Sequence, residues 1–204
     1  MIQIDQSAGL WVVTLARPDK ANSLTAAMLT DLSAAIDAAS AASAHALILT
    51  GAGRVFSAGA DLDEARAGLA TSPLWEELSG RIARAPFLTI AALNGTLAGG
   101  AFGMALACDL RLCVPGAKFF YPVMKLGFLP QPSDPARLAA LVGPARAKMI
   151  LMGGARILAD EALNWGLVDR IAEPDQLLPE AQALCTDALS ADNAHVAAIK
   201  RLVP

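Results

Sequence analysis

Leu97-Ala98-Gly99-Gly100-Ala101 is the stretch around which the rest of the chain is organised. It lies in a run from Ala85 to Cys108 that has no ionisable side chain except the thiol of Cys108. Phe87 to Leu93 is long enough for one buried strand, and residues 101–107 suit a helix that is apolar nearly all round. The paired glycines lack β-carbons where this helix begins, and its free N–H groups can receive an anionic atom there. The run therefore predicts a buried strand, a glycine loop and a core helix.

The same run has to be weighed as a membrane span, because it exceeds the roughly 20 residues that cross a bilayer. Pro86, Asn94 and two separate glycine sites would break such a helix, and no cluster of Lys and Arg marks one side. A buried strand, loop and helix accounts for the run better. Close packing of the helix on the strand would also explain the glycines, but a second glycine loop, described below, favours a functional role.

The composition is that of a compact globular protein. Of the 204 residues, 55% are hydrophobic and 17% are charged, which excludes a disordered chain. This length favours one domain over residues 1–204, with a core at about 1–172 and a helical part at about 173–204. The net charge of −3 provides no basic surface for nucleic acid, and the few aromatic residues are not interleaved with Lys or Arg.

Cysteine usage and the N-terminal residues predict a cytoplasmic protein. Cys108, Cys113 and Cys185 are odd in number, and the first two have apolar surroundings, so we expect reduced, buried thiols. No basic leader precedes an apolar run at the N-terminus. Neither His45 nor His195 has a motif partner, and no cluster of residues has the spacing of metal ligands.

Strands alternate with helices through the middle of the chain, which predicts a mixed α/β fold. A hairpin of residues 2–5 and 10–15 comes first, and a helix capped by Ser23 or Thr25 follows it. Residues 51–59 are expected to form a loop without a strand. Further strands are predicted at 46–49, 87–93, 110–114, 118–121 and 167–171. Further helices are predicted at 61–70, 74–85, 101–107, 137–142, 144–152, 160–165, 177–189 and 191–202.

The second glycine loop runs from Gly51 to Asp61, between a predicted strand and a predicted helix. A dinucleotide fingerprint would need glycine in place of Phe56, and a serine nucleophile elbow would need G-x-S-x-G around Ser57. Neither pattern is present. The remaining interpretation is a pair of backbone N–H donors, one from each glycine loop, that converge on a single oxygen. Such an oxyanion hole needs small residues because its donors belong to the backbone.

Phe56-Ser57-Ala58-Gly59-Ala60-Asp61-Leu62 resembles the oxyanion motif of the enoyl-CoA hydratase/isomerase family, the crotonases. Three other segments resemble that family in the same order along the chain. Residues 15–24 are similar to its first acyl-CoA-binding segment, residues 93–109 to its second glycine loop, and residues 153–171 to a later segment. The resemblance therefore covers almost the entire chain.

The resemblance implies a crotonase-like spiral of ββα units with C-terminal helices, usually assembled into trimers or dimers of trimers. The family's substrates are acyl-CoA thioesters, so CoA is part of the substrate and no separate cofactor is implied. Its shared chemistry stabilises a thioester enolate through two backbone N–H groups, which map here to Ala60 and Gly100. By the same resemblance, CoA would lie near Lys20, Ala21, Ser23, Ala58, Asp61 and Leu62, mostly through main-chain contacts. Lys20 is the one cation there that could meet a phosphate, and a solvated turn lysine would explain it equally well.

Two positions depart from the family pattern. Family hydratases carry one glutamate where this chain has Gly103, and another where it has Val123. Hydration of a conjugated double bond needs one group to activate water and one to protonate the α-carbon, and neither glycine nor valine can do so. Because the chain stops at Pro204, the resemblance also implies that the family's last helices, which cover the site or the trimer contact in relatives, are missing.

Asp134, in the Pro-rich loop, is the candidate acid or base, and the alternative is a helix N-cap or a loop aspartate. Asp61 is expected to order its own loop by accepting backbone N–H groups. Tyr121, the only tyrosine, is either a packed ring or a hydrogen-bond donor to the substrate. Three glutamates beside the helices after the oxyanion loop are further candidates: Glu64, Glu76 and Glu77.

The sequence as a whole predicts a crotonase-family enzyme that acts on acyl-CoA thioesters through a stabilised enolate. Double-bond isomerisation or related enolate chemistry is favoured over hydration. The alternative is a catalytically silent subunit with the same fold that binds acyl-CoA or serves assembly. The expected partners are an acyl-CoA thioester and further copies of the chain in a homo-trimer or hexamer, with neither nucleic acid nor a membrane.

Overall fold

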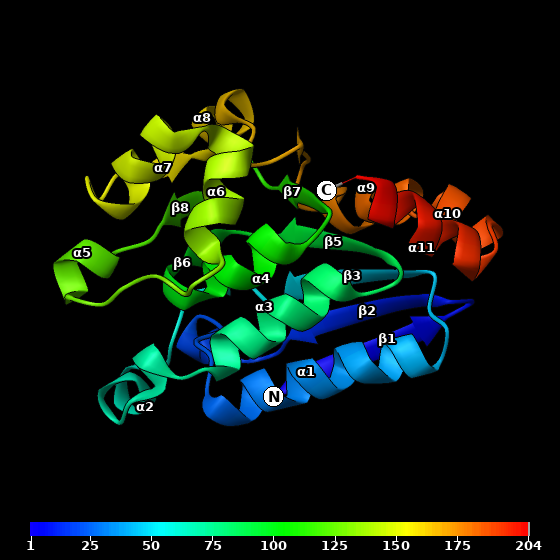
Figure 1. The fold of residues 1–204 in the computed structure, drawn as a ribbon, viewed down its shortest axis with the longest axis horizontal. Coiled ribbons are helices and arrows are strands. Elements are labelled where there is room, and N and C mark those ends of the chain that lie inside the picture. The colour runs from blue at the N-terminus through cyan, green and yellow to red at the C-terminus, as the bar shows by residue number, and fades with distance from the viewer. Residues whose placement is uncertain (204) are drawn as a thin grey trace.

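Two β-sheets and the helices that cover them make up the computed structural model, which describes residues 1–203 (Figure 1). The larger sheet has six strands in the order β1, β2, β3, β5, β7, β10, and the smaller has four in the order β4, β6, β8, β9. β1 is antiparallel to β2, and β8 to β9, whereas the other neighbouring strands are parallel. The strands are β1 (Ile2–Ser7), β2 (Leu10–Leu15), β3 (Ala46–Gly51), β4 (Val55–Ser57), β5 (Leu88–Leu93), β6 (Thr96–Ala98), β7 (Leu110–Cys113), β8 (Lys118–Phe120), β9 (Ile157–Leu158) and β10 (Arg170–Ile171).

The helices form groups on the two faces and at the ends of the sheets. Figure 1 shows α1, α3 and α4 side by side in front of the larger sheet, and α9 contacts β5 and β7. At one end of the molecule α2 and α5 stand apart from each other, and α9 to α11 lie at the other end. The helices are α1 (Ala26–Ala41), α2 (Leu62–Arg66), α3 (Leu74–Arg84), α4 (Phe102–Ala107), α5 (Val123–Leu126), α6 (Asp134–Val142), α7 (Pro144–Leu151), α8 (Ala159–Trp165), α9 (Leu177–Leu184), α10 (Thr186–Ser190) and α11 (Asn193–Leu202).

The core lies between the larger sheet and the helices. β3 and β5 are buried along almost their whole length, as is typical of parallel strands covered on both faces. Every residue of α4 is buried, which confirms the expectation of a core helix that is apolar all round. The uncharged run from Ala85 to Cys108 is thus divided into β5, β6 and α4. No helix within residues 1–203 is both long and apolar enough to cross a membrane.

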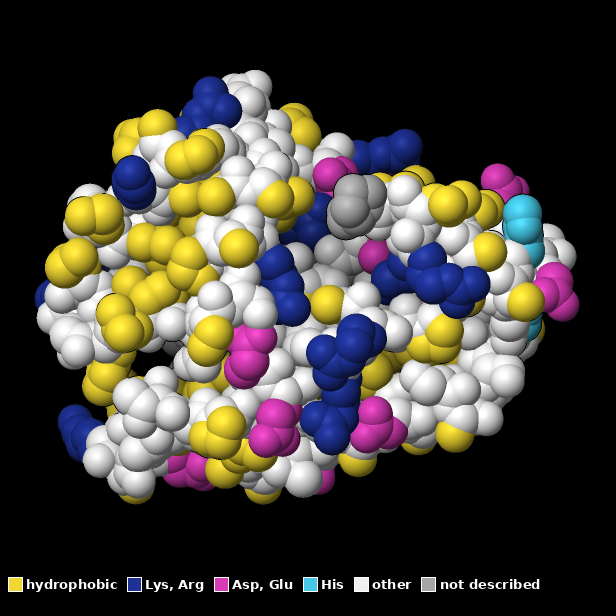
Figure 2. All heavy atoms as spheres, viewed as in Figure 1, with side chains coloured by type: hydrophobic (Ala, Val, Ile, Leu, Met, Phe, Trp, Pro, Cys, Tyr) yellow, Lys and Arg dark blue, Asp and Glu magenta, His cyan; other side chains and the backbone are white. Residues whose placement is uncertain are grey.

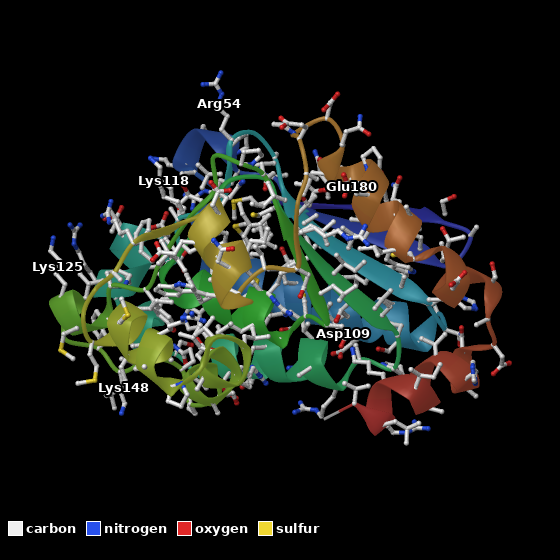
Figure 3. The ribbon with its side chains drawn as sticks, turned by 90° about the horizontal axis from the view of Figure 1, so that it is seen from above. Arg54, Asp109, Lys118, Lys125, Lys148 and Glu180 are labelled. Atoms are coloured by element: carbon white, nitrogen blue, oxygen red, sulfur yellow. The ribbon has the colours of Figure 1, made fainter. Side chains whose placement is uncertain are left out.

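Two ion pairs, one of them with the buried Arg111, connect β7 to the C-terminal region. The guanidinium of Arg111 on β7 donates to the carbonyl of Leu167 at 3.0 Å and pairs with Asp169 at 3.4 Å. Asp109, which precedes β7, accepts from Lys200 on α11 at 2.8 Å. In Figure 3 the labelled Asp109 lies between the sheet and these last helices. Paired and hydrogen-bonded charges of this kind tolerate burial because their polar atoms are satisfied.

Several predicted elements are confirmed. The hairpin of β1 and β2 forms as expected, and the hydroxyl of Thr25 caps α1 by accepting from the N–H of Met28 at 3.2 Å. All three cysteines are buried and free. Burial raises the pKa of Cys108 and of Cys113 to about 12, so both remain neutral thiols.

Other predicted boundaries are wrong. The loop predicted at 51–59 contains β4, and β6, β9 and α5 are also additional elements. These elements are two to four residues long, too short for a periodic pattern, and the strands gain their hydrogen bonds only by pairing with distant segments. α6 begins at Asp134 instead of at 137, because Pro135 is tolerated in a first helical turn. The strand predicted at 167–171 is reduced to β10, and the helices predicted at 61–70 and 177–189 are each divided in two.

Candidate active site

The two glycine loops meet at one edge of the smaller sheet. β4 and β6 pair in parallel, so the loops that follow them leave from the same edge. Gly59 and Gly99 both have positive φ, +92° and +58°. A β-carbon on Gly59 would lie 2.9 Å from the carbonyl oxygen of Ala98. Both positions therefore need glycine, for the left-handed backbone and for the close approach of the loops.

The structure brings together the two predicted backbone donors. On either side of Ala60, the carbonyl of Gly59 and the N–H of Asp61 are bonded to Leu24 at 2.8 Å each, which fixes the position of the peptide between them. Gly100 lies in the 3₁₀ turn Gly99–Ala101 that precedes α4, where N–H groups have no intrahelical acceptor. Ala60 and Gly100 both line one cavity of about 130 Å³. Backbone N–H groups at such a position can stabilise negative charge on an oxygen.

The cavity lies between α2 and α5. Figure 2 shows an opening on this face at that place, bordered by hydrophobic side chains. Leu126, Phe128 and Leu129 form part of its wall, and no described residue that lines it has a charged side chain. The labelled Lys125 on α5 projects outward from the molecule (Figure 3). The cavity therefore suits a ligand that has an apolar group attached to a polar group without charge.

Asp134 lies behind this wall, in the first turn of α6. Its side chain is buried, with the residue only 1% exposed, and it does not line the cavity. The hydroxyl of Tyr121 donates to its Oδ2 at 2.9 Å, whereas Oδ1 has no partner within residues 1–203. Burial raises the pKa of Asp134 to about 6, although the hydrogen bond from Tyr121 and the charge of Arg137 oppose this rise. The residue is a buried carboxyl with a raised pKa, and its side chain does not cap the helix.

The carboxyl of Asp134 takes the space beside Gly103. A β-carbon on Gly103 would lie 3.0 Å from Oδ1 of Asp134. The absence of a side chain at 103 on α4 therefore makes room for the carboxyl from α6. Val123, the second position that departs from the family pattern, is buried and contributes an apolar part of the cavity wall.

The three candidate glutamates hold structure together away from the cavity wall. Glu64 accepts from the N–H of Ala26 at 2.6 Å and so caps α1, and Glu77 lies 3.8 Å from Arg81 one turn along α3. Glu76 accepts from both the N–H and the hydroxyl of Ser133, which attaches α3 to the start of α6. Partial burial acts to raise the pKa of Glu76, but these hydrogen bonds lower it overall. None of the three lines the cavity.

The residues expected near CoA fall into a half-buried group, Ala21, Ser23 and Asp61, and an exposed group, Lys20, Ala58 and Leu62. Asp61 pairs with Arg17 at 2.8 Å and accepts from the N–H groups of Asp63 and Glu64 at the start of α2. The hydrogen bond from Arg17 lowers the pKa of Asp61. The expectation that Asp61 orders its own loop is therefore confirmed. Ala58 lines the cavity and donates its N–H to Ala21 at 3.0 Å. Ser23 is half-buried, and Lys20 and Leu62 are exposed beside the loop.

Asn22 is a supporting residue that the sequence analysis missed. It is fully buried with a φ of +50°, and its Nδ2 donates to the carbonyls of Ala52 and Val55 at 2.9 and 2.7 Å. Its Oδ1 accepts from the N–H of Arg17 at 2.9 Å. The side chain thus fixes the loop that enters β4. An asparagine after a turn is a weak signal, because exposed turns use the same residue for its tolerance of positive φ.

A family model described as enoyl-CoA hydratase/isomerase matches residues 5–203. The chain belongs to the enoyl-CoA hydratase/isomerase family. Members of this family are enzymes that act on acyl-CoA thioesters, so the enzyme class and the substrate class expected from the resemblance are confirmed.

Individual relatives show both the fold and the range of chemistry. The chain is 34% identical over 183 residues to "Probable enoyl-CoA hydratase echA6" of Mycobacterium bovis, covering 90% of this chain and 74% of the relative. It is 35% identical over 180 residues to "4-chlorobenzoyl coenzyme A dehalogenase-2" of Arthrobacter, covering 83% of this chain and 65% of the relative. The crystal structure of an enoyl-CoA hydratase from Bacillus anthracis superimposes with a TM-score of 0.91 at 31% identity, covering 98% of this chain and 81% of that one. The predicted crotonase-like α/β fold is confirmed.

Proposed function

We propose that this member of the enoyl-CoA hydratase/isomerase family stabilises the enolate of an acyl-CoA thioester and moves a double bond within the acyl chain, in preference to adding water. The observation that carries the proposal is the cavity on which Ala60 and Gly100 lie together, with one carboxyl, Asp134, behind it. Two N–H groups stabilise the thioester oxygen as it becomes negative. Isomerisation then needs a single group that removes a proton from one carbon and returns it to another, whereas hydration needs two.

Asp134 is the acid/base carboxyl in this proposal. Replacing it by asparagine keeps the size of the side chain and an acceptor for Tyr121, but it removes proton transfer. We expect Asp134→Asn to lower enoyl-CoA isomerisation by about 10²- to 10⁴-fold while acyl-CoA binding is kept. Asp63→Asn, which changes an exposed carboxylate on α2, is the matched control and should keep its rate. An undiminished rate in Asp134→Asn would contradict the assignment, and a wild-type protein that binds acyl-CoA without turnover would favour the silent subunit.

The isomerisation rate is expected to fall at acid pH. A base must be ionised, and burial raises the pKa of Asp134 to about 6. The rate should therefore be full above this pH and fall as the pH drops through it. The charged groups around the carboxyl are Arg137 on α6 and Glu76 on α3, while α4 presents Gly103 to it.

The proposed position of CoA follows the surface beside the oxyanion loop. Main-chain groups around Ala21, Ser23 and Ala58 would contact it, Leu62 would pack against it, and Lys20 would meet a phosphate. The exposure of Lys20 and Leu62 and the place of Ala58 on the cavity wall support this position. No group of His, Cys, Asp and Glu within residues 1–203 could hold a metal ion. We accordingly propose CoA as part of the substrate, without a separate cofactor.

A homo-trimer or hexamer is the proposed assembly. Figure 2 shows hydrophobic side chains gathered over α5 to α7, and Met124, Met149 and Met152 are among the exposed ones. A larger, mostly apolar groove of about 740 Å³ lies between α6 and the helices α10 and α11. Monomers seldom leave so much apolar surface uncovered. Sedimentation at micromolar concentration should show three or six copies, and a monomer alone would contradict the proposal.

The proposal also covers the number of domains and the cellular compartment. Residues 1–204 would act as one domain, since strands from both halves of the chain build the larger sheet. The cytoplasm would be its compartment, in keeping with three buried thiols that form no disulfide.

A further inference from the structure

The carboxyl of Asp134 does not lie on the cavity wall. Tyr121 is the one described residue on the wall whose side chain can exchange a proton, whereas Asp134 is 1% exposed and lies behind it. A carboxyl that does not line the cavity is poorly placed to touch a substrate carbon itself. We propose that Tyr121 is the catalytic residue that exchanges the proton with the substrate, and that Asp134 acts through it as the positioning and proton-holding residue. This inference rests on the proposed function.

The ring of Tyr121 is held in place from two sides. It stacks on Phe102 of α4 with ring centroids 5.3 Å apart and an interplanar angle of 23°. Its hydroxyl donates to Oδ2 of Asp134 at 2.9 Å and accepts from the N–H of Gln131 at 3.4 Å. A hydroxyl has one proton and two lone pairs. The contacts therefore use the proton and one lone pair. In the proposed arrangement the second lone pair faces the cavity that Tyr121 lines, where it would meet a substrate C–H group.

Tyr121 also lies near the proposed oxyanion donors. It shares the cavity with Ala60 and Gly100, and its stacking partner Phe102 begins the helix that follows Gly100. An acyl group whose thioester oxygen meets these two N–H groups would extend along the same wall. The carbon atoms that lose and regain the proton would then pass the Tyr121 hydroxyl.

The proton transfer balances within these groups. The C–H bond of the substrate breaks, its electron pair forms the enolate, and the proton goes to Oη of Tyr121. At the same time the original hydroxyl proton moves to Oδ2 of Asp134, so Tyr121 stays neutral. The reverse transfer returns a proton to another carbon of the enolate and restores the carboxylate. No oxidant, water molecule or further reactant is consumed.

Concerted movement of the two protons agrees with the surroundings of each group. Burial and the neighbouring Asp134 raise the pKa of Tyr121, so a free phenolate is disfavoured. Asp134, with a pKa of about 6, is the better place for the proton to rest. Glu76 on α3 adds negative charge near both groups, and Arg137 on α6 adds positive charge near Asp134. Gly103 on α4 contributes no side chain, which leaves the carboxyl free to face Tyr121.

The test compares Tyr121→Phe, Asp134→Asn and the double variant by the rate of double-bond isomerisation in an enoyl-CoA at pH 7.5, with acyl-CoA binding measured alongside. The Phe variant keeps the ring and its stacking on Phe102. We expect each single variant to lose at least about 100-fold in isomerisation rate, and the double variant to lose no more than the worse single one. Binding should stay within about threefold. The rate that remains in Tyr121→Phe should no longer fall as the pH drops through 6.

A rate that is kept in Tyr121→Phe can be told apart from a failure of the proposed function. If Asp134 contacts the substrate directly, Tyr121→Phe frees the carboxylate from its hydrogen bond and should keep or raise the rate. That result would overturn the inference and leave the proposed function standing. The absence of isomerisation by the wild-type protein, with acyl-CoA bound, would instead overturn the proposed function.

Discussion

Crotonyl-CoA hydration by the unmodified protein is expected to run several orders of magnitude below that of a family hydratase. Two positioned carboxylates contribute about 10²- to 10⁴-fold each as general acid or base. At the two positions where the resemblance implies glutamates, this chain has Gly103 on α4 and Val123 at the start of α5. Neither can activate water, and the nearby carboxyl of Asp134 does not line the cavity. Absorbance of the conjugated thioester, followed with crotonyl-CoA, measures the rate.

Restoring the glutamates requires a change at Asp134 as well. A β-carbon at position 103 would lie 3.0 Å from Oδ1 of Asp134, so a glutamate there would clash with and repel the existing carboxylate. The informative variant is therefore Gly103→Glu with Val123→Glu and Asp134→Ala, which we expect to gain hydratase activity. The same triple variant with Gln in place of both Glu residues is the matched control, because it fills equal space without an acid. Rapid hydration by the unmodified protein would defeat the argument.

Gly100→Pro should cost about 100-fold or more in the rate of any enolate chemistry, because proline removes one of the two proposed N–H donors. Acyl-CoA affinity should fall less than the rate, since the donor is needed most when the oxygen becomes negative. The isomerisation rate and acyl-CoA binding, measured on the same preparation, separate the two effects.

Gly100→Ala is the control for this substitution. It adds a β-carbon, which would lie 3.2 Å from the ring of Trp75, but it keeps the N–H. An alanine variant that retains most of the rate, beside a folded proline variant that does not, would assign the loss to the N–H. Equal rates in the wild-type protein and a folded Gly100→Pro would place the enolate oxygen elsewhere.

The central part of the fold could be predicted from local pattern. The strand and helix of the run from Ala85 to Cys108 appear as β5 and α4, because their apolar residues are continuous and the glycines mark the break between them. The hairpin around Gly9 and the helix capped by Thr25 also have clear local signals. The order of four family-like segments was enough to predict the family.

Short elements could not be predicted in this way. β4 and β6 have three residues each, and they exist as strands because they pair with each other across about forty residues of chain. α5 has four residues beside the cavity, and β9 pairs with β8 from a distant segment. Pairing between distant segments leaves little trace in the residues of either one.

The sequence by itself determined the glycine loops, their place before helices, and the presence of Gly103 and Val123 where the resemblance leads one to expect glutamates. Only the tertiary structure decided which side chains meet there. Packing of α6 on α4 brings the carboxyl of Asp134 beside Gly103, thirty-one positions earlier in the chain, and Tyr121 between that carboxyl and the cavity. Glycine at 103 is compatible with any neighbour, so nothing local specifies that a buried aspartate fills its space. The contact is set by how two helices cross, which depends on the summed packing of the core.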